Sequence, residues 1–254
     1  MSKINQFFKA EESQHACKNS ESVCHIAIIP DGNRRWAKTV GIRSEKGHRI
    51  GVRTLEKILN KWIKTKVPYF TFWGSSLDNI TKRTRKEINF LFRLITQQFK
   101  RIAKDKRIHQ NKVRINVLGR WQEVLSEETK RAIKRAIDKT KDYNEYFLTF
   151  LLAYDGQDEM IDCILHILKT AQNKVLKVTE KVIKEHFWTK DLPPVDLVIR
   201  TGCEDDPHMS AGFMMWDTSY SQYYFTKTFF PSFTPKEFGD IINDYLKRER
   251  RMGK

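Results

Sequence analysis

The stretch that decides the fold runs from His25 to His48 and reads HIAIIPDGNRRWAKTVGIRSEKGH. Its first five residues, His25–Ile29, form a short apolar run that predicts a buried strand ending at Pro30. Residues 31–33, Asp-Gly-Asn, predict a turn, and residues 34–38, which are mostly basic and aromatic, predict the opening of a helix. The stretch therefore predicts a strand, a tight turn and a helix in direct succession.

A junction of this kind suits an anion. The start of a helix carries unpaired backbone N–H groups, and the helix dipole favours negative charge there. Gly32 lets a ligand approach the backbone closely, and Arg34 and Arg35 add donors that suit phosphate oxygens. Asp31 repels phosphate unless a cation lies between them, so Asp31, phosphate and Mg²⁺ make one coherent site. An ordinary turn that caps a helix remains the alternative from these residues alone.

Composition indicates one globular domain, residues 23–254, after an N-terminal tail of residues 1–22. The 254 residues are 40% hydrophobic and 31% charged, with neither a linker nor a repeat. The longest apolar run, residues 146–154, is too short to span a bilayer, and the tail lacks an apolar signal core. Four cysteines without close spacing favour reduced thiols. We therefore expect a cytoplasmic protein.

The net charge of +16 is compatible with nucleic acid, an anionic membrane surface or a polyphosphate substrate. Much of the charge lies in Lys and Arg scattered along expected helices, which is typical of solvated helix faces. The chain has no helix-turn-helix, zinc or aromatic-rich RNA-binding signature, so nucleic-acid binding is the weaker hypothesis. Peripheral membrane contact is compatible with the same charge.

Predicted strands and helices alternate along the chain. Strands are expected at residues 25–29, 67–73, 113–118, 146–154, 195–200 and 221–225, and the main helices at 49–64, 84–107, 126–140, 157–171, 179–187 and 235–250. Alternation predicts an α/β fold with a mostly parallel sheet flanked by helices. Ligands of such folds bind beyond the carboxyl ends of the strands, where the polar loops at residues 31, 75–79, 154–157 and 200–210 should gather. This convergence favours an enzyme.

The motif Asp-Gly-Asn-Arg-Arg-Trp-Ala at residues 31–37, with Gly47-His48 beyond it, resembles the signature of the cis-prenyltransferases, the undecaprenyl diphosphate synthase family. Residues 195–204, VDLVIRTGCE, resemble the second diphosphate site of that family. The resemblance extends over residues 24–253. It implies a single α/β domain with an apolar tunnel for the prenyl chain, which the helix at 84–107 and the strand at 146–152 could line or could instead fill as ordinary core.

The resemblance implies a transferase that condenses isopentenyl diphosphate with an allylic diphosphate such as farnesyl or geranylgeranyl diphosphate. The product would be a Z-polyprenyl diphosphate, with an undecaprenyl-type lipid carrier as the expected case. The implied catalytic residues are Asp31, which would hold Mg²⁺, and Asn79, which would assist proton removal. The implied substrate-binding residues are Gly32, Asn33, Arg34, Arg35, Trp36, Arg43 and His48 for the allylic diphosphate, Ser75, Ser76, Asp78 and Arg83 beside Asn79, and Arg200, His208 and Ser210 for the diphosphate of isopentenyl diphosphate.

The chain departs from the family pattern in two places. The loop after Arg200 is longer and lacks an expected Arg, which His208 would replace. Gln222 stands where the family carries a Glu that helps hold Mg²⁺, and an amide oxygen can coordinate the ion but brings no charge. Three acidic residues could compensate, namely Asp205, Asp206 and Asp217. These departures motivate an alternative, a non-catalytic partner subunit of the same fold, and a short-chain branching or cyclising condensation is a further one.

The C-terminal residues Arg251 and Gly253 match an Arg-x-Gly ending that, in relatives, reaches the diphosphate site of a neighbouring subunit. The resemblance therefore implies a homodimer.

Overall fold

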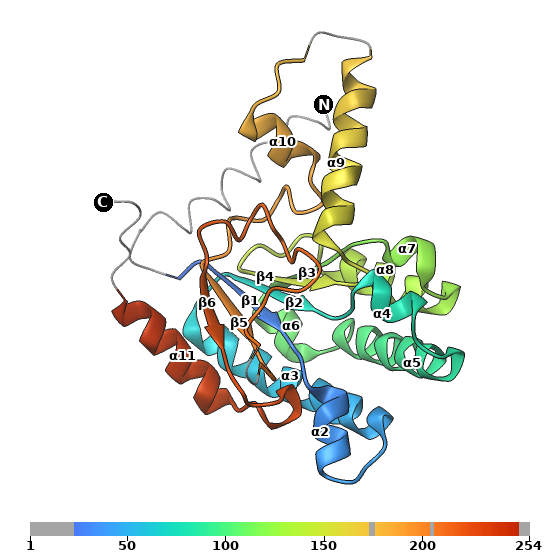
Figure 1. Ribbon diagram of the computed structural model, residues 1–254, viewed down its shortest axis with the longest axis vertical. Coiled ribbons are helices and arrows are strands. Elements are labelled where there is room, and N and C mark those ends of the chain that lie inside the picture. Colours follow the sequence, from blue (N-terminus) through green and yellow to red (C-terminus); the bar gives the residue numbers. More distant parts are fainter. Residues whose placement is uncertain (1–22, 173–175, 204–205, 249–254) are drawn as a thin grey trace. The chain divides into compact units, whose positions relative to one another are not determined.

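The computed structural model describes residues 23–172, 176–203 and 206–248 (Figure 1). Six strands form one sheet in the order β3-β4-β2-β1-β5-β6. The strands are β1 (His25–Ile29), β2 (Tyr69–Trp73), β3 (Val113–Leu118), β4 (Tyr146–Leu151), β5 (Leu197–Arg200) and β6 (Gln222–Phe225). The pairs β1–β5, β5–β6 and β3–β4 are parallel. The expectation of a mostly parallel α/β sheet is confirmed.

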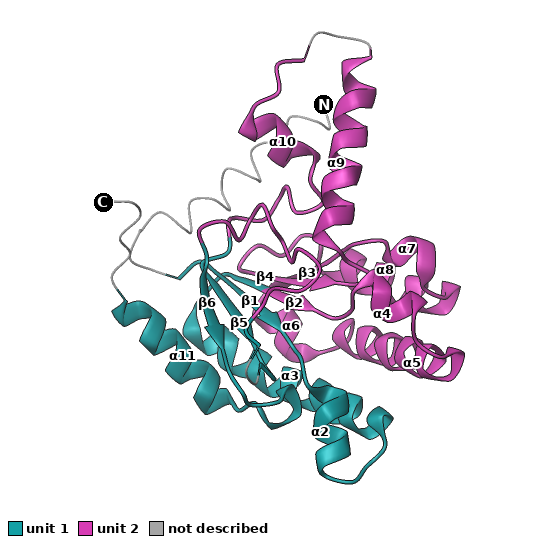
Figure 2. Ribbon diagram, in the orientation of Figure 1, with its two compact units in different colours: residues 1–70, 195–207, 221–254 teal, residues 71–194, 208–220 magenta. Residues whose placement is uncertain are grey.

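Helices connect these strands. They are α2 (Asn33–Thr39), α3 (Ser44–Thr65), α4 (Leu77–Thr81), α5 (Arg85–Ile102), α6 (Lys106–Gln110), α7 (Trp121–Val124), α8 (Glu127–Thr140), α9 (Gly156–Ala171), α10 (Glu180–His186) and α11 (Pro235–Lys247), with a short 3-10 helix, η2 (Phe230–Ser232). The chain divides into two compact units, with the division inside β2 (Figure 2). Unit 1 comprises residues 1–70, 195–207 and 221–254, and unit 2 comprises residues 71–194 and 208–220. The expected tail, residues 1–22, lies outside the described residues, so its boundary with a catalytic domain at residue 23 stays a prediction.

Unit 1 is built on β1, whose five residues are all buried. The parallel register pairs Ile29 with Arg200, and Arg200 with Phe225 of β6. Since parallel strands end at the same edge, the residues that follow Ile29 and Arg200 meet there. Aromatic side chains fill the core beneath the helices, with Phe70 of β2 lying 5.3 Å from Trp62 of α3 and 6.1 Å from Phe238 of α11 between ring centroids.

Unit 2 is held together by the packing of α5 against α8 and of α8 against β3. Between the two helices the hydroxyls of Thr96 and Thr129 are hydrogen-bonded at 2.8 Å. Phe99 of α5 packs edge-on against Phe150 of β4, with 5.3 Å between ring centroids. Because β3 alternates buried and half-buried residues, one of its faces packs on this core.

The boundaries of some elements differ from the expected ones. The single helix expected at 84–107 ends at Ile102, and Asp105 caps a separate helix, α6, by accepting the N–H of Arg107. The strand expected to reach residue 154 ends at Leu151, and Ala153 has a left-handed backbone with φ 51°. The short helices α4 and α7 were not expected, because four or five residues are too few to show a helical period.

The cysteines correct another expectation. Cys163 and Cys203 are free and buried, whereas Cys24 is disulfide-bonded. The expectation of reduced thiols is therefore wrong at Cys24, where the spacing of the cysteines gave no signal.

Over the part of the chain that the structure describes, no helix has both the length and the apolar character needed to cross a bilayer.

Candidate active site

The turn after β1 requires a glycine. Gly32 has φ 97° and directly precedes α2, which has no side-chain cap at its first turn. A Cβ at Gly32 would lie 2.4 Å from Cδ1 of Phe229, so the ring leaves room for backbone alone. Both the left-handed conformation and the close contact exclude other side chains at this position. The first turn of α2, where the sequence predicts an anion, therefore follows a backbone turn that only glycine can make and has no side-chain cap.

Asp31 is the charged centre of this turn. Its Oδ1 accepts the N–H of Gly32 at 2.5 Å. Its Oδ2 lies 3.2 Å from Nη2 of Arg200 and 3.3 Å from Nη2 of Arg35. The Arg200 side chain is only 7% exposed, whereas Asp31 is 39% exposed. A half-exposed carboxylate thus lies between a buried guanidinium and an exposed one, and the expectation that residues 31 and 200 lie together is confirmed.

Several contacts hold Arg35. Besides Asp31, its Nη2 donates to the carbonyl oxygen of Gly202 at 2.6 Å. Its guanidinium carbon lies 5.2 Å from the centroid of the Phe229 ring, a cation–π contact. Arg35 is nevertheless largely exposed. Its charge is therefore oriented toward the end of β5 while remaining accessible to an anion.

The other residues predicted for the allylic diphosphate lie on α2 and at the start of α3. Arg34 and Arg43 are exposed, and Trp36 and His48 are half-buried. Asn33 differs, because its side chain packs against α3 and donates to the carbonyl of Pro30 at 3.4 Å. Cβ atoms at Gly47 and Gly51 would lie 2.4 Å from the carbonyl oxygen of Asn33 and 2.2 Å from its Oδ1, respectively. The side chain and the backbone carbonyl of Asn33 therefore both pack closely on α3.

In unit 2 the loop at residues 75–79 forms a hydrogen-bonded corner. Ser75 Oγ accepts the N–H of Ala153 at 3.0 Å. Ser76 caps α4, because its Oγ accepts the backbone N–H of Asn79 at 3.0 Å and the side-chain Nδ2 of Asn79 at 2.6 Å. Arg83 Nη2 donates to Oδ1 of Asn79. The Asn79 amide is thus oriented at both ends.

Unit 2 carries three more of the predicted binding residues, and they are Asp78, His208 and Ser210. Asp78 is exposed and pairs with Lys82 at 2.6 Å. His208 is exposed and Ser210 is half-buried. The segment that carries them is anchored on the start of α9, where the N–H of Gly156 donates to the carbonyl of Ala211 at 2.9 Å.

Gln222 is the first residue of β6 and pairs with Leu197, three residues before Arg200 along β5. Asp31 instead follows the carboxyl end of β1. The Oε1 of Gln222 accepts from Nη1 of Arg248 at 3.3 Å. The expectation that Gln222 and Asp31 hold one Mg²⁺ stays a prediction.

Two of the three acidic residues that could compensate for Gln222 lie in the described part of the chain. Asp217 is buried and paired with Lys184, and Asp206 is exposed. Asp205, Arg251 and Gly253 lie outside the described residues. Among the described residues no three His, Cys, Asp or Glu side chains form a group that could hold a metal ion.

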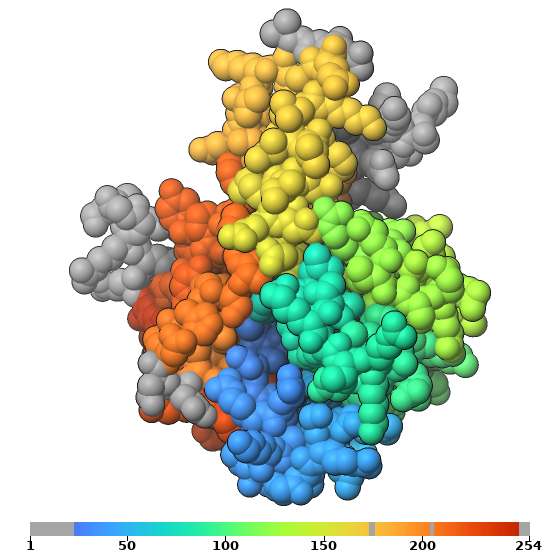
Figure 3. Space-filling view, turned by 45° about the vertical axis from the view of Figure 1, so that its right-hand side comes forward, coloured from blue at the N-terminus to red at the C-terminus, as the bar shows by residue number. Residues whose placement is uncertain are grey.

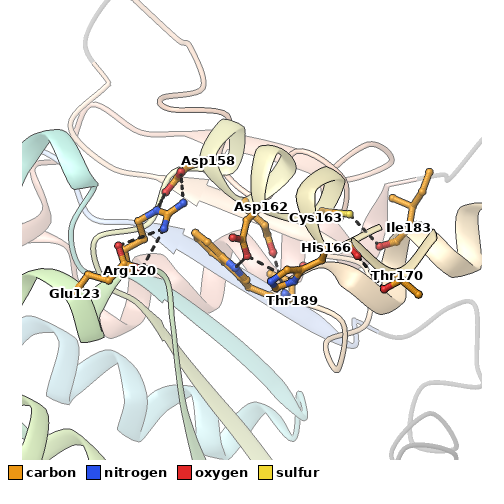
Figure 4. Close-up of polar contacts among 11 residues, drawn as sticks. Arg120, Glu123, Asp158, Asp162, Cys163, His166, Thr170, Ile183 and Thr189 are labelled. Carbon is orange, nitrogen blue, oxygen red and sulfur yellow. Dashed lines mark hydrogen bonds and ion pairs between the residues drawn. The ribbon is translucent and has the colours of Figure 1, made fainter. Parts of the chain in front are cut away.

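Residues 154–159 have a structural role in unit 2. Glu159 is only 2% exposed. Its Oε2 accepts a hydrogen bond from the hydroxyl of Tyr154, and its Oε1 accepts the N–H of Thr189 at 2.9 Å. Burial raises the pKa of Glu159. Neighbouring carboxylates on α9 face the same way, since Asp158 binds Arg120 and Asp162 accepts from Trp188 Nε1 at 2.7 Å (Figure 4). One side of α9 is therefore fixed by polar contacts.

Comparison with known proteins decides the family. The family model of the undecaprenyl diphosphate synthases, a prenyltransferase family, matches residues 29–253, which include both Asp31 and Arg200. The chain belongs to the undecaprenyl diphosphate synthase family. The expectations of this family and of a transferase of the prenyl diphosphate synthase type are therefore confirmed.

Individual members of the undecaprenyl diphosphate synthase family are similar over almost the whole chain. The tritrans,polycis-undecaprenyl-diphosphate synthase (geranylgeranyl-diphosphate specific) of Pyrococcus abyssi is 35% identical over 233 residues, covering 91% of this chain and 86% of the relative. The isoprenyl transferase of Thermus thermophilus is 33% identical over 237 residues, covering 91% and 88%. The crystal structure of lavandulyl diphosphate synthase from Lavandula x intermedia with dimethylallyl diphosphate matches with a TM-score of 0.86 and 25% identity, covering 93% of this chain and 100% of that one. The relatives are named as synthases and transferases, so the alternative of a non-catalytic partner subunit is not favoured.

Two residues of this synthase site were not predicted from the sequence. Thr201 hydrogen-bonds twice to the backbone of Asp31, and Phe229 packs on both Gly32 and Arg35. Thr201 adjoins Arg200 in the second family motif, which is the one signal that could have drawn attention to it. Phe229 lies about 200 residues along the chain from Gly32, and no pattern in the sequence connects them.

Proposed function

We propose that this chain extends an allylic diphosphate with isopentenyl diphosphate to a Z-polyprenyl diphosphate of the undecaprenyl type. The observation that carries the proposal is the meeting of Asp31 and Arg200, because it joins the two diphosphate motifs of the family at the ends of β1 and β5. Geranylgeranyl diphosphate is the first primer to test, since the Pyrococcus relative is named as specific for it. Farnesyl diphosphate is the second.

The allylic diphosphate is proposed to bind the backbone of Gly32 and Asn33 and the side chains of Arg34 and Arg35. Guanidinium groups form charge-assisted hydrogen bonds with phosphate oxygens, and both arginines are exposed. Three further residues near this end of unit 1 are proposed to contact the same substrate, namely Trp36, Arg43 and His48. On binding, phosphate oxygens would compete with Asp31 and Gly202 for the Arg35 guanidinium.

Mg²⁺ is proposed to bind at Asp31. A site with one protein carboxylate fits this ion, because Mg²⁺ keeps several waters and commonly takes its other ligands from substrate phosphates. The half-exposed Asp31 carboxylate, oriented by Gly32, supplies that ligand. When bound, the ion would neutralise charge on the departing diphosphate.

For isopentenyl diphosphate we propose Arg200 as the residue that binds the diphosphate. A buried guanidinium at the end of a strand is costly unless it meets an anion, and the Arg200 guanidinium lies beside Asp31 at the end of β5. In unit 2, His208 and Ser210 are proposed as further diphosphate ligands. Asn79, with Ser75, Ser76, Asp78 and Arg83 around it, is proposed to orient the substrate and assist proton loss.

The growing prenyl chain is proposed to lie along α5. The apolar residues on this helix are mostly half-buried although they share one broad face, and they are Ile88, Leu91, Phe92, Leu94 and Ile95. In an ordinary core helix such a face would be fully buried, as Phe99 is. A prenyl chain would cover the remaining apolar surface.

A homodimer is proposed through α9. Four large apolar residues on this helix are about half exposed, at the spacing of one helix face, and they are Ile161, Ile164, Leu165 and Leu168. Figure 3 shows α9, in yellow, at the surface. Exposed apolar stripes of this kind mark interaction surfaces. The polar side of the same helix is already occupied by Arg120 and its neighbours.

Peripheral contact with an anionic membrane remains a secondary proposal, supported by the net charge of +16.

The experiment is an elongation assay. The purified full chain is incubated with Mg²⁺, geranylgeranyl or farnesyl diphosphate and labelled isopentenyl diphosphate, and the extracted products are sized by chromatography. We expect extension by several units with Z geometry. Incorporation of a single unit would favour a short-chain condensation, and no incorporation by the chain alone would favour the partner-subunit alternative.

A further inference from the structure

Thr201 makes an unusual pair of hydrogen bonds with one residue. It follows Arg200 at the end of β5 and is fully buried. Its Oγ1 accepts the backbone N–H of Asp31 at 3.0 Å and donates its proton to the backbone carbonyl of the same residue at 3.0 Å. The hydroxyl therefore contacts both sides of the Asp31 backbone and uses its single proton in doing so.

The backbone that Thr201 holds determines where the charged site lies. The Asp31 carboxylate must reach the N–H of Gly32 with one oxygen and Arg200 and Arg35 with the other. Rotation of the Asp31 peptide would move all three contacts at once. The residue that follows Thr201 is also held in place, because the carbonyl oxygen of Gly202 accepts a hydrogen bond from Nη2 of Arg35 at 2.6 Å.

Two other contacts also involve the Asp31 backbone. The Asp31 N–H also lies 3.1 Å from the carbonyl of Ile29, and the Asp31 carbonyl also accepts the N–H of Phe230 at 3.0 Å. Removal of the Thr201 hydroxyl would thus leave neither backbone group of Asp31 without a partner, and the chain should still fold. The loss of the hydroxyl would instead affect the orientation of the Asp31 peptide and carboxylate.

We propose that Thr201 is a positioning residue, which holds the Asp31 carboxylate in register with Arg200 and with the diphosphate-binding turn. This rests on the proposed function in that Asp31 is taken as the residue that meets Mg²⁺ and diphosphate. A valine of nearly the same shape cannot make either hydrogen bond, whereas serine can make both. The pair of variants therefore separates the hydroxyl from the volume of the side chain.

A matched control exists in the same unit. Thr54 of α3 is also buried, and its hydroxyl donates to the carbonyl of Pro231 at 3.0 Å rather than to Asp31. Thr54→Val therefore reports the general cost of losing a buried threonine hydroxyl. Thermal unfolding of Thr201→Val, Thr201→Ser and Thr54→Val establishes that each variant folds before any comparison is made.

The test has two readouts. In the elongation assay, Thr201→Val should lower kcat by roughly 10- to 100-fold, as is usual for residues that orient a ligand, and should raise the Mg²⁺ concentration that gives half-maximal rate. Thr201→Ser should restore both to near wild type, and Thr54→Val should leave both unchanged. Calorimetric titration with Mg²⁺ and inorganic diphosphate should show the same order of affinities, which keeps the test independent of turnover.

The outcomes separate the two proposals. If the wild-type chain binds Mg²⁺ and diphosphate but does not elongate, the proposed function fails while the positioning role is still judged by calorimetry. The positioning role is overturned if Thr201→Val matches wild type, if Thr201→Ser is as impaired as Thr201→Val, or if Thr54→Val shows the same loss. It is also overturned if wild type binds neither Mg²⁺ nor diphosphate.

Discussion

The guanidinium of Arg200 lies 3.2 Å from the carboxylate of Asp31, although 169 positions separate them in the sequence. The parallel pairing of β1 with β5 places Ile29 opposite Arg200 and so brings the two side chains to one edge of unit 1. Asp31 offsets part of the positive charge of Arg200 and of Arg35. A diphosphate that bound here with a cation, as proposed, would exchange these contacts for its own.

Asp31 should be essential for turnover and dispensable for folding. We expect Asp31→Asn, which keeps the shape but removes the charge, to lower the elongation rate by about 10²-fold or more, because charge stabilisation at the departing diphosphate is lost. Asp31→Ala should lower it at least as far. Steady-state kinetics with thermal unfolding checks this. Wild-type turnover in either variant would remove Asp31 from the mechanism.

Gly32 should tolerate substitution far less than Gly41, another glycine with positive φ. Both have left-handed φ values, 97° and 68°, but a Cβ at Gly41 would have nothing within 4 Å, whereas at Gly32 it would meet Phe229. Gly41→Ala should cost about 1 kcal/mol of unfolding free energy from backbone strain. Gly32→Ala should cost more and should also weaken diphosphate binding, because Phe229 supports Arg35. Denaturant unfolding and calorimetry measure the two effects, and equal costs would contradict the role assigned to Phe229.

Glu159 should make stability depend on pH. Burial raises its pKa in the folded chain, so the native state holds the proton more tightly than the unfolded chain does. Its stabilising contribution is then complete below about pH 4 and is lost as pH rises through the raised pKa. Glu159→Gln lacks this change, so the unfolding free energy of wild type, relative to that of the variant, should fall as pH rises. Denaturant titrations across this pH range measure it.

Tyr154→Phe provides a second variant for the same prediction. The Tyr154 hydroxyl donates to Glu159 and lowers its pKa, partly opposing the effect of burial. Without that hydroxyl, the loss of stability should extend to higher pH. A difference between wild type and Glu159→Gln that stays constant with pH would show that Glu159 has the same pKa in the folded and unfolded chains.

The apolar side of α9 should hold two chains together. Leu165→Glu places a charge in the middle of the exposed stripe and should shift the protein from the mass of two chains to that of one, because burial of an unpaired charge is costly. Val40→Glu, at an exposed apolar residue of unit 1, is the matched control and should leave the mass unchanged. Light scattering after size-exclusion chromatography decides between them. A wild-type chain that is monomeric at micromolar concentration would reject the dimer.

The sequence was sufficient to predict the sheet and to place Asp31 and Arg200 at the carboxyl ends of two of its strands. The apolar runs at β1 and β5 are local signals, and parallel topology alone places the residues that follow them at one edge. Contacts that depend on side-chain geometry between distant segments could not be predicted, and Phe229 against Gly32 and Thr201 on Asp31 are of this kind.

The place of Gln222 along β6 is set by strand register, which its motif does not reveal. Alignment with a motif places a residue near a site in sequence but does not say at which end of a strand it lies. Pairing of Gln222 with Leu197 sets it at the amino end of β6, away from Asp31 in the same chain. The break between α5 and α6 was missed for a related reason, because the cap at Asp105 interrupts a stretch whose apolar spacing continues.

The most direct test of the account is a crystal structure of the full chain with Mg²⁺ and an unreactive thio-analogue of geranylgeranyl diphosphate. The measured quantities are the distances from the diphosphate oxygens to the backbone nitrogens of residues 32–35 and from the metal to Asp31. We expect hydrogen-bond distances to that backbone and direct coordination by Asp31, with Arg200 beside the same edge. A diphosphate bound elsewhere, with the Asp31–Arg200 contact unchanged, would contradict the account.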